Sequence, residues 1–168
     1  YTVGGDSGGV GEVADYSSKG PTYQDKRLKP ELVAPGGDGG DYDYEVYDRY
    51  GVVSTRGRDE NGKLLEHNER DPWPEDPDYY LRMAGTSMAA PHVAGIAALI
   101  QQAYGDQFSD DDGLCPRDVK AILIANAIPL KGYGDDYKNG YANIYCGYGL
   151  VDAYFSLFAK DNERENLL

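Results

Sequence analysis

Basic side chains, histidines and cysteines are all scarce in this chain of 168 residues. There are 16 Lys and Arg against 29 Asp and Glu, so the formal net charge is −13. Such a surplus of negative charge repels phosphate groups, and neither nucleic acid nor an anionic membrane is expected as a partner. No apolar run approaches the roughly 20 residues that a bilayer span requires. At 168 residues the chain is long enough for one domain with a core, although its mean hydropathy of −0.62 is modest. One domain, or most of one, is expected.

The acidic residues are concentrated in one part of the chain. Residues 38–80 hold 13 acidic and 5 basic side chains. Within that stretch, residues 56–78 are charged and rich in proline, and they include Trp73, the chain's one tryptophan. We interpret residues 56–78 as an acidic surface insertion packed through Trp73. A solvated loop is the alternative explanation of the same composition.

The two cysteines allow one disulfide at most. Cys115 and Cys146 are either paired, as in an oxidising compartment, or two free buried thiols. Neither cysteine has a histidine or a second cysteine at metal-ligand spacing, so no metal site is assigned to them.

Two acidic clusters offer oxygen atoms of the kind that calcium binds. Asp110–Asp112 are followed by Gly113, and Asp135 is followed by Asp136. Calcium takes several oxygen ligands, and it is the one cofactor that the sequence suggests. The spacing of the aspartates in these two clusters matches no calcium loop that we can name. A solvated run of charge is the alternative interpretation.

The most informative segment is Gly85–Gly95, with the sequence GTSMAAPHVAG. From Met88 to Ile100 only His92 is strongly polar, which predicts a helix that is apolar on all sides and buried in a larger body. Pro91 is tolerated only near a helix start, so we expect a helix from Ser87 to about Tyr104. Ser87 then lies at the N-terminus, where free N–H groups and the helix dipole favour negative charge beside its hydroxyl. Such a position suits a nucleophile.

The remaining elements alternate between strands and helices. Short strands are expected at Tyr1–Gly4, Val13–Ser17, Leu32–Ala34 and Gly51–Thr55, the last one buried, with Tyr79–Ala84 leading into the serine helix. Two further helices are expected at Pro116–Ala127, with Val119, Ile122 and Leu123 on one face, and at Gly149–Phe158. This alternation predicts an α/β layered body with a parallel sheet.

The GTSMAAPHVAG segment resembles the nucleophile motif of the subtilisin-like serine peptidases (subtilases). Residues 16–21 (YSSKGP) and 29–36 (KPELVAPG) are similar to the family's segment upstream of the serine, and residues 147–153 (GYGLVDA) to its closing segment. The resemblance implies a three-layer subtilisin-like fold with a mainly parallel sheet, of which only the C-terminal part is present. Residues 1–159 would form that part, and residues 160–168 a charged tail.

The resemblance also assigns roles at the serine. Ser87 would be the catalytic nucleophile of a serine endopeptidase, and its backbone N–H would donate to the oxyanion. Thr86 would support that oxyanion hole. Many subtilases have an asparagine before the Gly-Thr-Ser, whereas this chain has Ala84, so a polar contact near the cleft is absent.

A serine hydroxyl needs a base, and the base needs a carboxylate. His92 follows Ser87 by five residues, so it lies about 140° around the helix and cannot serve; it is similar to the packing histidine of the family's Pro-His pair. His67 lies in a charged stretch without a matching motif and is interpreted as a solvated histidine. The family's Asp, His and oxyanion Asn motifs are absent from the chain, and in family order they precede Tyr1. We therefore expect no useful peptidase activity from the chain alone, and expect the missing N-terminal part as its partner.

Two alternatives accompany this interpretation. Ser87 could persist only as a helix N-terminal residue in a non-catalytic pseudoenzyme or binding module. Gly5–Gly9 (GDSGG) matches the nucleophile motif of trypsin-like enzymes, but it comes at the wrong place in the chain, and a glycine-rich turn explains Ser7 better. The subtilase resemblance implies a protein or peptide substrate and a secreted or cell-envelope location.

Overall fold

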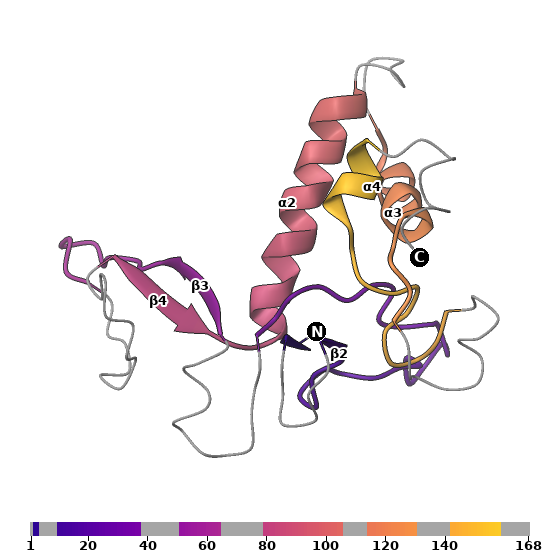
Figure 1. The fold of residues 1–168 in the computed structure, drawn as a ribbon, viewed down its shortest axis with the longest axis horizontal. Coiled ribbons are helices and arrows are strands. Elements are labelled where there is room, and N and C mark those ends of the chain that lie inside the picture. Colours follow the sequence, from indigo (N-terminus) through magenta and orange to yellow (C-terminus); the bar gives the residue numbers. More distant parts are fainter. Residues whose placement is uncertain are drawn as a thin grey trace. The chain divides into compact units, whose positions relative to one another are not determined.

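The computed structural model describes residues 2–3, 10–37, 51–64, 79–105, 114–130 and 142–158. The chain divides into two compact units, one made of Tyr1–Ser17 and Pro35–Ala89 and the other of Ser18–Ala34 and Ala90–Leu168. Figure 1 shows the described strands and helices along the chain. No helix among the described residues is both long and apolar enough to span a bilayer.

Two antiparallel strand pairs form the first unit. β1 (Thr2–Val3) pairs with β2 (Val10–Glu12), and the register shifts between Thr2 and Val3. The strand expected at Tyr1–Gly4 is therefore confirmed as a short one. The strand expected at Val13–Ser17 is wrong, because the chain turns there and Ser17 N donates to Ala14 O at 2.9 Å.

The second pair is a hairpin that leads directly into the serine helix. β3 (Val52–Thr55) and β4 (Tyr80–Met83) pair in a register that sets Val52 opposite Met83 and Thr55 opposite Tyr80. The strand expected at Gly51–Thr55 is confirmed as β3, but its expected burial is wrong, since Val53 is 44% exposed. A two-stranded sheet buries a face only when another layer covers it, and the β3 residues Val53–Thr55 are exposed.

The polypeptide after β3 makes a tight, exposed turn. Arg58 and Leu64 form an antiparallel bridge, and the Asp59 carboxylate accepts the N–H groups of Asn61 at 2.9 Å and Lys63 at 2.8 Å. These bonds satisfy the turn's backbone locally. The remainder of the expected insertion, Trp73 included, lies outside the described residues.

The serine helix, α2, spans Thr86–Tyr104, one residue longer than expected. It begins at Thr86, so Pro91 falls in the second turn rather than the first, and its ring nitrogen cannot donate to the Ser87 carbonyl. The expected burial on all sides is wrong for this structure. Ile100 is the one buried side chain among the helix residues, and a face of small apolar residues is exposed: Ala90, Pro91, Ala94, Gly95, Ala98 and Leu99.

The second unit has its core beneath two shorter helices, α3 (Pro116–Ala125) and α4 (Ala153–Leu157), which lie beside the C-terminal turns of α2 (Figure 1). The Tyr104 hydroxyl of α2 donates to the Leu157 carbonyl of α4. α3 ends two residues earlier than expected. α4 is much shorter than Gly149–Phe158, because Asp152 is its N-cap and accepts the Phe155 N–H at 2.8 Å.

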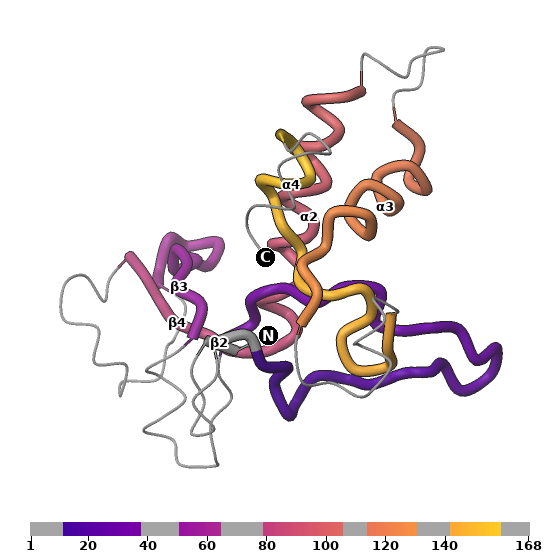
Figure 2. Tube along the Cα trace, turned by 45° about the vertical axis from the view of Figure 1, so that its right-hand side comes forward, coloured from indigo at the N-terminus to yellow at the C-terminus, as the bar shows by residue number. Residues whose placement is uncertain are grey.

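Segments far apart in sequence are joined by single bridges in this unit. Leu150 pairs with Val33 in parallel and with Ile128 antiparallel. Gly20 N donates to Ile144 O at 2.9 Å. Residues 18–34 (indigo) and 142–158 (yellow) can be followed in Figure 2. The Val33 bridge is the one parallel pairing among the described residues, so the expected parallel sheet is not seen there. The apolar core is built from Val33, Ala34, Ile100, Leu114, Leu123, Ala127, Leu130, Cys146 and Val151.

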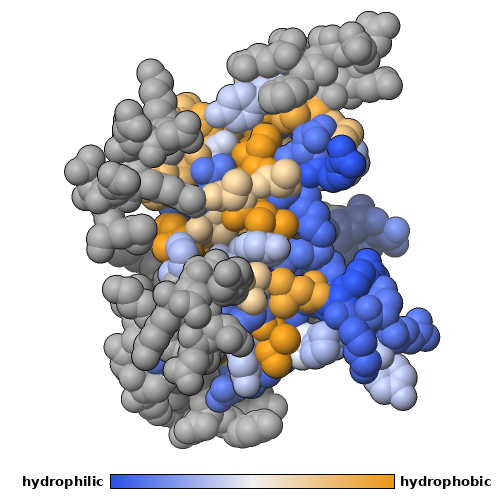
Figure 3. Space-filling view, turned by 90° about the vertical axis from the view of Figure 1, so that its right-hand side faces the viewer, coloured by the Kyte–Doolittle hydropathy of each residue, from blue (hydrophilic) through white to orange (hydrophobic). Residues whose placement is uncertain are grey.

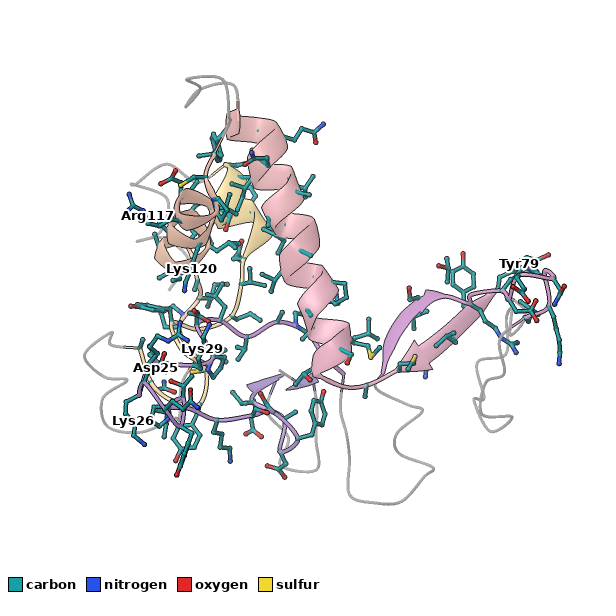
Figure 4. All side chains as sticks on the ribbon, turned by 180° about the vertical axis from the view of Figure 1, so that it is seen from behind. Asp25, Lys26, Lys29, Tyr79, Arg117 and Lys120 are labelled. Atoms are coloured by element: carbon teal, nitrogen blue, oxygen red, sulfur yellow. The ribbon has the colours of Figure 1, made fainter. Side chains whose placement is uncertain are left out.

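The carboxylate of Glu31 links α3 to a segment that lies about ninety positions earlier in the sequence. Glu31 accepts from the ammonium groups of both Lys29 and Lys120, and Figure 4 shows the two lysines on the same side of the second unit. Partial burial opposes ionisation of Glu31, but the hydrogen bonds and charges of the two lysines outweigh it and lower its pKa to about 2. The carboxylate is therefore ionised down to strongly acidic pH.

Both cysteines are free thiols, and the disulfide alternative is not realised in this structure. Cys146 is fully buried, and burial raises its pKa. Its N–H donates to the Asn143 side-chain oxygen at 3.0 Å. Cys115 is exposed, not buried, and its thiol donates to Asp118 at 2.8 Å. Figure 3 shows hydrophobic residues (orange) at the surface between hydrophilic ones (blue). Leu99 is 46% exposed and Phe158 is 67% exposed.

Candidate active site

Ser87 is the second residue of α2, and Thr86 is the first. Both side chains are exposed. The carbonyl of Gly85 accepts the first helical bonds, from Met88 N at 3.0 Å and Ala89 N at 3.3 Å. The N–H groups of Thr86 and Ser87 have no hydrogen-bond acceptor within the described part of the chain. Two donors without an acceptor among the described residues, together with the positive end of the helix dipole, therefore lie in the same first turn as Ser87, an arrangement that favours negative charge there.

The turn before Ser87 is held from behind by a pair of glycines. Gly85 has a φ of 149°, which side-chain-bearing residues rarely adopt, and its N–H donates to the Gly36 carbonyl at 2.7 Å. A Cβ on Gly36 would lie 2.8 Å from the Gly85 oxygen, and a Cβ on Gly37 would lie 3.1 Å from the Ala84 Cβ. The backbone at 36–37 therefore packs directly against residues 84–85.

Tyr16 also contacts the glycine pair, through its hydroxyl group. Its hydroxyl donates to the Gly36 carbonyl at 2.9 Å and also contacts the Gly37 carbonyl oxygen. Tyr16, Gly36 and Gly85 all belong to the first unit. The sequence identifies Tyr16 and Gly36 only as parts of segments similar to the family's, and it does not predict their contact. The Pro35-Gly36-Gly37 run was the one signal of it.

The structure does not place a base beside Ser87 within the residues that it describes. His92 is the one histidine among them, is half-buried and belongs to α2, about 140° around the helix from Ser87. His67 and Ser7 lie outside the described residues. The described residues thus offer an exposed serine hydroxyl at a helix N-terminus, while the proton acceptor that a nucleophilic serine requires is not among them.

The described residues also hold no candidate metal centre. No group of three or more His, Cys, Asp or Glu side chains that could hold a metal ion occurs in the described ranges. The two acidic clusters suggested for calcium, at residues 110–112 and 135–136, lie outside those ranges. Calcium binding therefore stays a prediction.

A serine at an unpaired helix N-terminus, backed by a glycine turn, has the construction of a serine-hydrolase nucleophile site. The model of the subtilase family matches residues 2–149, so the chain belongs to the subtilase family of serine peptidases. This confirms the resemblance found in the GTSMAAPHVAG segment.

Individual relatives agree with the family match. The chain is 35% identical to the serine protease AprX of Bacillus subtilis over 141 residues, which cover 84% of this chain and 24% of AprX. It is 36% identical to the minor extracellular protease Vpr of the same organism over 120 residues, 71% of this chain and 11% of Vpr. A solved lanthipeptide protease is 30% identical with a TM-score of 0.55, covering 76% of this chain and 33% of that one. The chain thus spans at most about a third of these proteins.

Proposed function

We propose that this chain is the C-terminal part of the catalytic domain of a subtilisin-like serine endopeptidase, with Ser87 as its nucleophile. The observation that carries the proposal is the exposed Ser87 in the first turn of α2, beside N–H groups with no acceptor in the described residues. Its hydroxyl would attack the scissile carbonyl of a protein or peptide, and water would hydrolyse the acyl-enzyme. The Ser87 N–H would stabilise the oxyanion, with support from Thr86.

The base, its carboxylate and the oxyanion Asn would come from an N-terminal part of the same protein. Supporting this, His92 is the one described histidine and is directed away from Ser87 by the helix geometry. Loss of the base from a serine triad lowers turnover by about a millionfold. The 168-residue chain alone is therefore proposed to be inactive.

The exposed face of α2 supports the same partner. Ala90, Ala94 and Ala98 recur every four residues on one side of the helix, and Leu99 beside them is 46% exposed. A Cβ on Gly95 would have no neighbour within 4 Å. A face of such small residues allows close approach of another layer. We propose that the N-terminal part covers this face and completes a three-layer fold with a mainly parallel sheet.

The nucleophile is tested by fluorophosphonate labelling of the complete protein. Labelling is expected on Ser87, and Ser87→Ala should abolish it while leaving the melting temperature unchanged. Ser54→Ala, at an exposed serine of β3, is the matched control and should label normally. A complete protein that folds but does not label would favour the non-catalytic pseudoenzyme or binding module instead. Hydrolysis of peptides by the 168-residue chain alone, lost on Ser87→Ala, would contradict the proposed inactivity.

Location and calcium are extensions of the same proposal. A secreted or cell-envelope protein is supported by the name of one relative, the extracellular protease Vpr. Calcium would bind through the acidic clusters at 110–112 and 135–136. Melting the complete protein with calcium and with a chelator tests this, and equal melting temperatures would refute it.

A further inference from the structure

The Gly36 carbonyl oxygen lies between a tyrosine hydroxyl and the turn that carries Ser87. It accepts from the Tyr16 hydroxyl at 2.9 Å and from the Gly85 N–H at 2.7 Å. A carbonyl oxygen has two lone pairs and can accept both bonds at once. Tyr16 and Gly85 are thus joined through one backbone oxygen, although 69 positions separate them in the sequence.

The glycine pair has little freedom to move within this arrangement. A Cβ at Gly36 would lie 2.8 Å from the Gly85 oxygen and 3.1 Å from the Tyr16 hydroxyl oxygen. The Gly37 carbonyl contacts the same hydroxyl. One hydroxyl hydrogen is shared between two carbonyls, so the tyrosine fixes both peptide groups of the pair together.

We propose that Tyr16 is a positioning residue for the nucleophile, acting through Gly36 and Gly85 on the first turn of α2. This inference rests on the proposed role of Ser87. The Gly36 bond fixes the direction of the Ala84–Gly85 peptide group. The carbonyl of the next peptide group, that of Gly85, accepts the N–H groups of Met88 and Ala89 that begin the helix. Removing the hydroxyl loosens the Gly36 carbonyl, and the serine turn then samples orientations that are unproductive for attack.

The first test is Tyr16→Phe in the complete protein, because this substitution removes the hydroxyl and keeps the ring. Displacement of a reacting group by about 1 Å costs up to about a hundredfold in rate, and we expect a fall of about tenfold in kcat and in the rate of fluorophosphonate labelling. KM should change by less than about twofold, since ground-state binding is untouched. Tyr23→Phe is the matched control, as Tyr23 is 90% exposed, and should leave all three values unchanged.

The second test does not depend on catalysis. Hydrogen exchange resolved to single amides should show faster exchange at Gly85 in Tyr16→Phe, with unchanged exchange at the hairpin amides of β3 and β4. Unchanged exchange at Gly85, unchanged kcat, or uniformly faster exchange over the whole first unit would each overturn the positioning role. If the wild-type protein neither labels nor turns over substrate, the proposed function fails, and the exchange at Gly85 still decides whether Tyr16 holds the turn.

Discussion

Gly36 is the residue at which the site tolerates least change. A methyl group there would meet the Gly85 oxygen at 2.8 Å, so Gly36→Ala must push apart the two backbone segments that hold the serine turn. Overpacking of this kind costs about 1–3 kcal/mol, and the melting temperature should fall by about 2–12 °C. Fluorophosphonate labelling of Ser87 should slow as well. Calorimetry and labelling kinetics of the complete protein measure both effects.

The control for this substitution is Gly105→Ala, where a Cβ would meet nothing within 4 Å. Its melting temperature is expected to stay within about 1 °C of the wild type. Equal melting temperatures and labelling rates for Gly36→Ala and the wild type would show that residues 36–37 are not packed against the turn.

The two thiols should differ strongly in reactivity. Thiolates, not thiols, react with iodoacetamide. Cys146 is fully buried and its pKa is raised by that burial, whereas Cys115 is exposed. Brief alkylation at about pH 8 should therefore modify Cys115 alone, with Cys146 modified only after denaturation. Peptide mass spectrometry reads the two sites separately, and comparable labelling of both in the folded chain would contradict the described packing of Cys146.

At the residue scale, Ser87 and Thr86 were predictable as candidate site residues, but the contacts that hold their turn were not. Ser87 and Thr86 stand in a long, specific motif at a helix start, and the structure places them there. Tyr16 acts through a backbone carbonyl twenty positions away, and a contact between a hydroxyl and a backbone oxygen leaves no pattern of side-chain types. Only Gly36 and Gly37, which follow Pro35, indicated that another backbone segment approaches this part of the chain closely.

At the scale of elements, the Glu31 link should make stability depend on pH in acid. The folded-state pKa of Glu31 is lowered from 4.5 to about 2, so folding favours the ionised form. The stabilisation is complete above the unfolded pKa and is lost as the pH falls from about 4.5 towards 2. Because both lysines are partly exposed, the link contributes about 1–2 kcal/mol.

The measurement is the free energy of unfolding of the wild type and Glu31→Gln from neutral pH to about pH 2. The variant should be less stable at neutral pH, and the difference should vanish near the acid end of that range. Glu60→Gln, at an exposed carboxylate in the turn after β3, is the control. A constant difference between wild type and Glu31→Gln at all pH values would mean that ionisation of Glu31 is not its source.

The helices were predicted more accurately than the strands, for a physical reason. α2 and α3 have local start signals, a serine or proline at the N-terminus, and apolar residues that continue for several turns. The exposure of β3 depends on which layer covers it, which its own residues do not specify. The alternation at Val13–Ser17 resembled a strand, but Ser17 N bonds back to Ala14 O in a turn.

At the scale of the whole molecule, the family was predictable while the layers were not. The match over residues 2–149 follows from short segments that the sequence displays directly. A parallel sheet, in contrast, needs neighbouring strands, and the described residues supply one parallel bridge, Val33 with Leu150. The sequence predicts burial for the small residues of α2, whereas in this structure Ala90, Ala94 and Ala98 are exposed.

The exposed face of α2 yields a test of what covers it in the complete protein. Ala98 is exposed here, so Ala98→Lys would cost little if the face remained in water. If an N-terminal part packs on this face, the substitution buries a charge, which costs several kcal/mol and should lower the melting temperature by about 5 °C or more. Ala121→Lys, at an exposed alanine of α3, is the control and should shift it by about 1 °C at most. Equal, small shifts for both variants would show that α2 keeps this face in solvent, and the proposed three-layer completion would then be wrong.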